Sequence, residues 1–131
     1  MKEKVYLQSG VVPCRIVDNR VFILLVESTR SGWVIPKGGI ASNLTPLQSA
    51  LKEAWEEAGV KGIAKKKRIG IYTYSKYGVE YSVKVFLMYV NRVYSRYPEQ
   101  RTRKRKWVAL DSINDYVKDE TLLNIITDTL G

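Results

Sequence analysis

The chain has 131 residues, a net charge of +9 and 45% hydrophobic residues, which predicts one soluble globular domain covering residues 1–131. It contains no histidine, which excludes histidine-dependent catalytic triads and histidine-ligated metal sites. Its single cysteine, Cys14, cannot form an internal disulfide, and no apolar run reaches the roughly 18 residues of a membrane span. We therefore expect a cytoplasmic protein without a membrane partner.

The positive charge is concentrated in residues 61–106, which contain fourteen Lys and Arg but two acidic residues, Glu80 and Glu99. Such a field attracts polyanions, so we expect a polyanionic small-molecule substrate. RNA is a second compatible partner. Nothing in this pattern distinguishes a monomer from a homodimer.

Three apolar runs near the N-terminus predict strands. Val5–Leu7 and Val11–Ile16 predict two short strands, and Pro13 inside the second run favours an edge strand or a bulge. Asp18-Asn19 then predicts a turn. The continuous apolar run Val21–Val26 predicts a buried central strand.

Two connecting segments follow these strands. Glu27–Gly32 predicts a polar loop, in which Arg30 is either part of a solvated connection or a contact to a substrate phosphate. The glycines Gly38 and Gly39 predict a turn after the apolar run Trp33–Ile35.

The next segment predicts a helix whose start and end are both marked in the sequence. Thr45 is an N-cap residue, Pro46 suits the first helical position, and Gln48 completes a Thr-x-x-Gln capping box. Gly59 marks the C-terminal end. Apolar residues spaced by three and four form one buried stripe, namely Leu47, Ala50, Leu51, Ala54, Trp55 and Ala58.

Three glutamates, Glu53, Glu56 and Glu57, are predicted on the other side of this helix. Like charges at these spacings destabilise a helix by about 0.2–0.5 kcal/mol per pair. Lys52 is the cation that lies nearby in sequence. A divalent cation such as magnesium or manganese relieves this repulsion through oxygen ligands, whereas the alternative interpretation is a solvated acidic helix face.

From Gly38 to Val60 the sequence resembles the Nudix box, Gly-x5-Glu-x7-Arg-Glu-U-x-Glu-Glu-x-Gly-U, in which U is aliphatic. Two positions depart from it, because Leu44 replaces the first glutamate and Lys52 replaces the arginine. The run WVIPKGG before the box and Trp107 after it extend the resemblance to a whole Nudix domain. The remaining positions fall in register, namely Glu53, Ala54, Glu56, Glu57 and Gly59.

The resemblance implies an α/β fold, a Nudix-type α/β/α sandwich with a mixed β-sheet. It also implies metal-dependent hydrolysis of a phosphoanhydride in a nucleoside diphosphate-linked or related substrate, with Mg2+ or Mn2+. By this resemblance Glu56 and Glu57 bind the cation, with the carbonyl of Gly38 or its neighbour as a further ligand. Glu53 binds the metal or acts as the base, so that Glu53 and Glu57 form the catalytic pair.

The segments GWVIPKGG and EEAGVKG are similar to those of relatives that act on diadenosine polyphosphates or diphosphoinositol polyphosphates. Lys37, inside the first segment, is therefore expected to contact the substrate. RNA with a 5′ triphosphate is also compatible with the basic surface. The alternative is a catalytically weak nucleotide- or RNA-binding Nudix module, which the three box glutamates argue against and Leu44 mildly favours.

The second half of the chain predicts a hairpin in which Ile69–Tyr74 and Val79–Val90 flank a turn at Tyr77-Gly78. Its tyrosines are interpreted as packing residues, although one of them could instead flank a base. The candidates for that second role are Tyr72, Tyr74 and Tyr81.

A basic loop is predicted at Tyr94–Lys106. Arg101 and Arg103 in this loop belong either to a phosphate-binding rim or to a solvated surface. Glu99 is either an additional acidic ligand or a surface residue. Three elements are predicted to close the chain, namely a strand at Trp107–Leu110, a brief helix capped by Asp111 and a last helix capped by Asp119.

Overall fold

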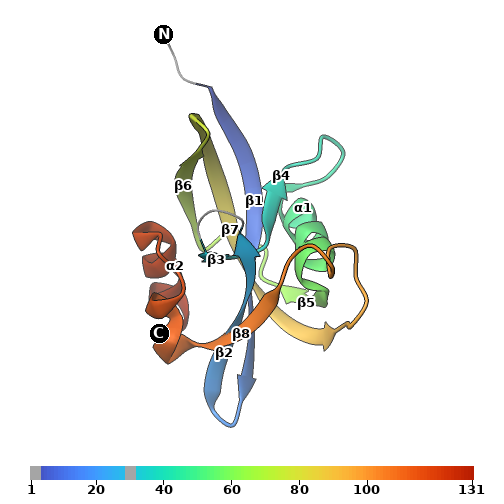
Figure 1. Cartoon of the computed structure of the whole chain (residues 1–131), viewed down its shortest axis with the longest axis vertical. Coiled ribbons are helices and arrows are strands. Elements are labelled where there is room, and N and C mark those ends of the chain that lie inside the picture. Colours follow the sequence, from blue (N-terminus) through green and yellow to red (C-terminus); the bar gives the residue numbers. More distant parts are fainter. Residues whose placement is uncertain (1–3, 29–31) are drawn as a thin grey trace.

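The computed structural model describes residues 4–28 and 32–131, which form one mixed β-sheet flanked by helices (Figure 1). The strands are β1 (Val5–Val17), β2 (Arg20–Ser28), β3 (Gly32–Val34), β4 (Lys37–Gly39), β5 (Val60–Ala64), β6 (Gly70–Lys76), β7 (Val79–Val93) and β8 (Arg105–Ala109). The helices are α1 (Pro46–Glu53), a π-helical turn (Ala54–Ala58), a 3-10 helix (Leu110–Asp115) and α2 (Glu120–Leu130).

Strands β1 and β7 form the parallel centre of the sheet, with Val5–Cys14 paired to Glu80–Tyr89. The path through the sheet is β3-β2-β1-β7-β5, and β8, β4 and β6 pair with β2, β1 and β7 respectively. All of these other pairings are antiparallel. The sheet is therefore mixed, as expected.

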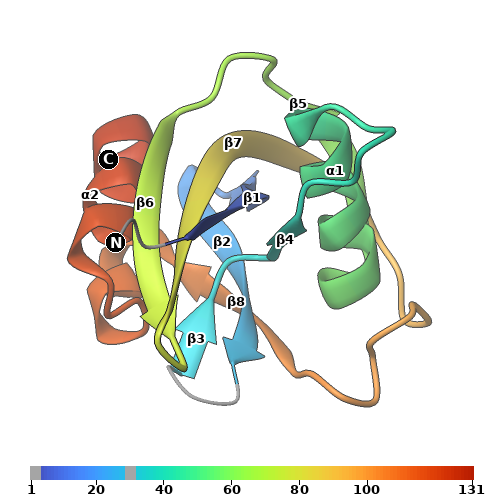
Figure 2. The same ribbon diagram turned by 90° about the horizontal axis from the view of Figure 1, so that it is seen from above.

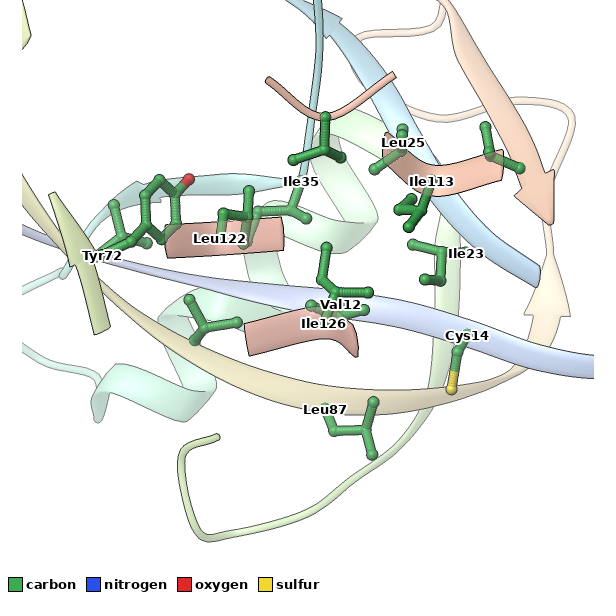
Figure 3. Close-up of a cluster of buried hydrophobic side chains, with 14 residues drawn as sticks. Val12, Cys14, Ile23, Leu25, Ile35, Tyr72, Leu87, Ile113, Leu122 and Ile126 are labelled. Atoms are coloured by element: carbon green, nitrogen blue, oxygen red, sulfur yellow. The ribbon is translucent and has the colours of Figure 1, made fainter. Parts of the chain in front are cut away.

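One core lies on each face of the sheet. Figure 2 shows α1 on one side and α2 on the other, which confirms the predicted sandwich. The core beneath α2 is drawn in Figure 3 and includes Val12, Leu25, Tyr72, Leu122 and Ile126. The core beneath α1 contains Val11, Leu24, Ala50, Ala54, Ala58 and Phe86. Alternate residues of β1 and β2 supply opposite cores because successive side chains of a strand point to opposite faces.

The N-terminal strand differs from the prediction, since the two expected short strands are one strand of 13 residues. Pro13 lies in its middle and not at a sheet edge, opposite Met88 of β7. On its other side β1 pairs with β4 up to Gly10 and with β2 from Cys14 onwards. Pro13 therefore lies in the gap between β4 and β2, where no strand on that side needs a backbone N–H donor from β1.

The second half of the chain matches most predictions, with longer strands. Tyr77 and Gly78 both have positive φ, 52° and 75°, as a tight two-residue hairpin turn requires. The prediction missed β5, a short strand without clear alternation that pairs with the end of β7. The predicted short helix is present, but the predicted cap at Asp111 was wrong. The helix is of the 3-10 type, its N-cap is Ala109, and no side chain caps it.

Asp119 caps the last helix as predicted, because its Oδ1 accepts a hydrogen bond from the backbone N–H of Leu122 at 2.9 Å. Across residues 4–28 and 32–131, no helix is long and apolar enough to cross a membrane.

Candidate active site

The helix that carries the three glutamates begins with the predicted capping box. The Thr45 side chain accepts a hydrogen bond from the backbone N–H of Gln48 at 3.1 Å, and the Gln48 side chain accepts one from the Thr45 N–H at 2.9 Å. Leu44, directly before this cap, is partly buried. The cap fixes the start of α1 relative to the loop that follows β4.

The end of the helix differs from a regular α-helix. Ala54–Ala58 form a π-helical turn, which closes at Gly59 in the left-handed conformation with φ of 65°. A π-turn holds more residues than an α-turn, so it rotates the side chains that follow it away from their α-helical positions. The three glutamates therefore do not form the solvated acidic face of the alternative interpretation, since Glu57 is buried with 3% of its surface exposed.

The carboxyl group of Glu53 lies directly against Gly38 of β4. A Cβ atom added at Gly38 would overlap the Glu53 carboxyl carbon and both of its oxygens. A side chain at position 38 would therefore push the flexible end of Glu53 away from β4, although the φ angle of Gly38 is not positive. This contact connects the glycine pair with the helix, two features that the sequence places fifteen positions apart.

Glu57 is held between Glu53 and an arginine from the distant basic loop. Its Oε1 accepts a hydrogen bond from Nη1 of Arg103 at 2.9 Å, and the Glu53 carboxyl is its second side-chain partner. Burial is the main cause that raises the pKa of Glu57 to about 9, and Glu53 acts in the same direction, whereas Arg103 opposes the shift. A hydrogen bond between the Glu53 and Glu57 carboxyl groups requires a proton on one of them.

Glu56 lies apart from this pair. Its carboxylate forms an ion pair with Nζ of Lys52 at 2.7 Å, one turn earlier on the surface. In the described residues no three Asp, Glu, Cys or His side chains are placed together as a ready-made metal site. The structure brings together Glu53, Glu57 and Gly38, while Glu56 would have to leave Lys52 to join them.

The donor set at this site nevertheless fits a hard divalent cation. Two carboxyl groups lie within hydrogen-bond reach of one another in a place where burial makes a second negative charge unfavourable. Oxygen ligands of this kind suit magnesium and manganese, whose positive charge would replace the shared proton.

The backbone of the basic loop is hydrogen-bonded to the end of the helix that carries the box glutamates, called the box helix below (α1 and the π-helical turn, residues 46–58). Tyr94 N–H donates to the Gly59 carbonyl at 2.8 Å, and Glu99 N–H donates to the Glu56 carbonyl at 2.9 Å. Arg105 donates from Nη1 to the Ala58 carbonyl at 2.8 Å and stacks on the ring of Tyr97. A cation at the C-terminal end of a helix is also favoured by the helix dipole. Sequence reasoning missed this role of Arg105, which no local pattern indicates.

Lys37 lies next to the glutamates on β4. Burial lowers the pKa of Lys37, while the charges of Glu57 and Glu53 act in the opposite direction. Its Nζ lies 4.8 Å from the ring centre of Tyr74. Lys37 therefore stands between the carboxyl pair and the aromatic side chains of β6.

A cavity of about 340 Å3 begins at Lys37 and extends between β3, β6 and the N-terminal end of α2. Its lining includes Trp33, Lys37, Tyr72, Tyr74, Lys76 and Lys118. The Tyr72 hydroxyl is buried and has no hydrogen-bond partner in the described part of the chain. A buried hydroxyl without a partner is unfavourable, so a ligand that reached it would gain a hydrogen bond.

The predicted substrate contacts are distributed unevenly around this site. Lys37 and Arg103 lie at the glutamates, whereas Arg101 is exposed and makes no hydrogen bond or ion pair within residues 32–131. Arg30 lies outside the described residues. No local pattern indicated that Trp33 or Lys118 would line this cavity, because strands and helices far apart in the chain form it.

The chain matches a known protein family over most of its length. The family model described as the NUDIX domain matches residues 7–127. Nudix hydrolase 13, mitochondrial, of Arabidopsis thaliana is 26% identical over 147 residues, covering 95% of this chain and 73% of that protein. Diphosphoinositol polyphosphate phosphohydrolase 3-alpha of mouse is 29% identical over 93 residues, covering 68% of this chain but 56% of its own length.

A solved structure agrees in fold over almost the whole chain. The Ap4A hydrolase of Caenorhabditis elegans has a TM-score of 0.77 and 23% sequence identity, and the match covers 98% of this chain and 100% of that one.

Proposed function

The chain belongs to the Nudix family and is a Nudix-type pyrophosphohydrolase, and we propose that it hydrolyses a phosphoanhydride bond with Mg2+ or Mn2+ as cofactor. The substrates that we favour are diadenosine polyphosphates and diphosphoinositol polyphosphates. The observation that carries the proposal is the meeting of Glu53, Gly38 and the buried Glu57 beside two cations, Lys37 and Arg103.

In this proposal the carboxylates of Glu53 and Glu57 hold the divalent cation, with a backbone carbonyl at Gly38 as a further ligand. Glu56 joins them when it leaves Lys52, since its carboxylate is partly exposed and its ion pair is a surface one. The cation, when bound, neutralises phosphate oxygens and activates water. Glu53, which lies closest to Gly38, is our candidate for the base that orients and deprotonates the attacking water.

The cations around the carboxyl pair are proposed to hold the substrate's phosphates. Lys37 lies between the glutamates and the cavity, so a polyphosphate that passes from one to the other would contact it. Arg103 supplies a planar guanidinium, a group that binds phosphate through two parallel hydrogen bonds. Arg101 is proposed to add long-range attraction, which also suits RNA, and Arg30 remains a proposed contact to a substrate phosphate.

The cavity favours a nucleoside at the far end of the substrate. Trp33 and Tyr74 are partly exposed and offer aromatic surface for a planar base, and we propose that the bound base reaches the buried, unpaired Tyr72 hydroxyl. Lys76 and Lys118 add positive charge at the rim. This combination supports a dinucleoside polyphosphate, such as the Ap4A that the Caenorhabditis elegans protein is named for, ahead of an inositol polyphosphate.

The second candidate is a nucleotide- or RNA-binding Nudix module with weak catalysis. The observations in its favour are the engaged box carboxylates, since Glu56 is paired with Lys52 and Glu57 with Arg103. Leu44 adds to them, because it stands where the family has a glutamate.

Release of products from a panel of substrates separates the two candidates. The panel contains diadenosine tetraphosphate, a diphosphoinositol polyphosphate, ADP-ribose and 5′-triphosphorylated RNA, each with magnesium and with magnesium plus a chelator. We expect chelator-sensitive turnover, fastest for diadenosine tetraphosphate. Tight binding of a panel member without turnover at saturating magnesium or manganese would instead support the binding module.

A further inference from the structure

Arg103 donates a hydrogen bond to Glu57, one of the carboxyl groups proposed to hold the divalent cation. Resting on the proposed function, we propose that Arg103 exchanges between two anions: it pairs with Glu57 in the metal-free enzyme and with a substrate phosphate when the cation is bound. Binding of the cation and binding of phosphate are then coupled through this one side chain.

The contact at Glu57 is close and shielded. Arg103 Nη1 lies 2.9 Å from Glu57 Oε1, and the Glu57 side chain is 4% exposed. A divalent cation coordinated by the same carboxylate would approach the guanidinium closely and repel it. The cation and the guanidinium therefore compete for Glu57. Arg103 has to turn away from Oε1 before both oxygens of Glu57 can coordinate the metal.

The surroundings of Arg103 allow such a turn without unfolding the loop. The loop backbone is fixed to the box helix by the Tyr94–Gly59 and Glu99–Glu56 hydrogen bonds, and Arg105 fixes it a third time at Ala58. The Arg103 side chain is 30% exposed, so one side of it faces solvent. Its Nε also lies 3.7 Å from Glu99, which gives the turned-out guanidinium a second anion nearby.

Lys37 indicates where the released Arg103 side chain can bind a phosphate. These two cations come from different elements, the basic loop and β4, yet each lies close enough to feel the charge of the other. Two unpaired cations that face one another repel, and a phosphate between them removes the repulsion. A polyphosphate that runs from the carboxyl pair into the cavity has to pass Lys37, so its phosphates come within reach of the released guanidinium.

Coupling of this kind works in both directions. A phosphate that draws Arg103 away exposes Glu57 and tightens metal binding, and a metal that displaces Arg103 frees a phosphate ligand. Removing the Arg103 charge should therefore tighten metal binding in the absence of phosphate, although a substrate contact is lost.

The test titrates Mn2+ into the metal-free protein by calorimetry, without substrate, for wild type, Arg103→Gln and Lys104→Gln. Lys104 is the matched control, because it is the exposed neighbour in the same loop and its removal changes the net charge equally. We expect Arg103→Gln to bind Mn2+ about tenfold more tightly than wild type, within the usual range of coupling between sites. Lys104→Gln should change the affinity by about twofold or less, because exposed charges are screened.

A second arm repeats the titration in inorganic phosphate against chloride at equal ionic strength. Phosphate should tighten Mn2+ binding to wild type and have a smaller effect on Arg103→Gln. Arg103→Lys, which keeps the charge, should bind Mn2+ like wild type and guards against a loss of folding in the glutamine variant.

Three results separate the possible failures. Weaker Mn2+ binding by Arg103→Gln, or an affinity equal to that of Lys104→Gln, would overturn the exchange and make Arg103 a fixed support of Glu57. Tighter Mn2+ binding by Arg103→Lys than by wild type would also overturn the exchange, because this variant keeps the charge. If the exchange is overturned but wild type still hydrolyses a substrate, the proposed hydrolase function stands. If wild type binds no Mn2+, both the exchange and the metal-dependent function are wrong.

Discussion

Glu57 and Arg103 are 46 positions apart in the sequence, yet they form an ion pair of 2.9 Å at a carboxylate that is almost completely buried. The pair joins the box helix to the basic loop and so brings the strongest acidic cluster of the chain against its most basic segment. A buried carboxylate of this kind is stable only with a partner, which here is Arg103, a proton shared with Glu53 or a metal ion.

Replacing Glu57 by glutamine tests its role as a metal ligand. Because glutamine has the shape of glutamate and its side-chain oxygen can still accept from Arg103, Glu57→Gln should keep that contact and melt within a few degrees of wild type. Turnover should fall by about 100-fold or more, as happens when one group that stabilises the transition state is removed. Glu120→Gln, an exposed change on α2, is the control and should retain turnover. Equal turnover for both variants at saturating magnesium would rule out Glu57 as a ligand.

The raised pKa of Glu57 predicts a pH dependence of stability in the metal-free protein. The folded protein has a pKa of about 9 at Glu57 against the ordinary value of 4.5 in the unfolded chain, so between these pH values the folded state binds more protons. The free energy of unfolding should therefore fall as the pH rises through this window, by less than about 1.4 kcal/mol per pH unit. Urea unfolding of wild type and Glu57→Gln at several pH values measures the difference. A difference that does not change with pH would contradict the shift.

Gly38 and Gly39 provide a matched pair for the position of Glu53. Gly38→Ala places a methyl group into the Glu53 carboxyl and should displace it, which lowers affinity for Mn2+ and turnover by about tenfold or more. Gly39→Ala meets no described atom within 4 Å and has no positive φ, so it should bind Mn2+ like wild type. Calorimetric titration of Mn2+ into both variants gives the comparison. If both alanines had the same small effect, the Glu53 carboxyl would not need its place at Gly38.

Two tyrosines of β6 provide a second matched pair, for the cavity. The Tyr72 hydroxyl is buried and unpaired, so Tyr72→Phe should raise the free energy of unfolding by about 1 kcal/mol and raise KM for a nucleotide substrate. The Tyr74 hydroxyl donates to Gln8 Oε1 at 2.7 Å, so Tyr74→Phe should lower the free energy of unfolding instead. Chemical denaturation and steady-state kinetics of both variants test these signs. A loss of stability in Tyr72→Phe would mean that its hydroxyl has a partner in solution.

Several features follow from the sequence alone because neighbouring residues cause them. The capping box at Thr45 and Gln48, the cap at Asp119 and the turn at Tyr77-Gly78 each depend on contacts between residues no more than three positions apart. The apolar run within β2 also identified a buried central strand. The spacing of the box glutamates identified the family, since that pattern is itself local.

The tertiary structure decided which of these side chains meet. The sequence placed Glu53, Glu56 and Glu57 together on one side of the helix, but in the structure Glu57 is buried and Glu56 pairs with Lys52 at the surface. Burial, and with it the pKa of Glu57, depends on what covers a residue, and here the cover includes a loop residue from far along the chain.

The same reason applies to Pro13, whose place inside the sheet depends on where two partner strands end. It also applies to the cavity, whose walls come from β3, β6 and the start of α2. Periodicity reports the faces of one element, while contacts between distant elements are set by how the whole chain packs.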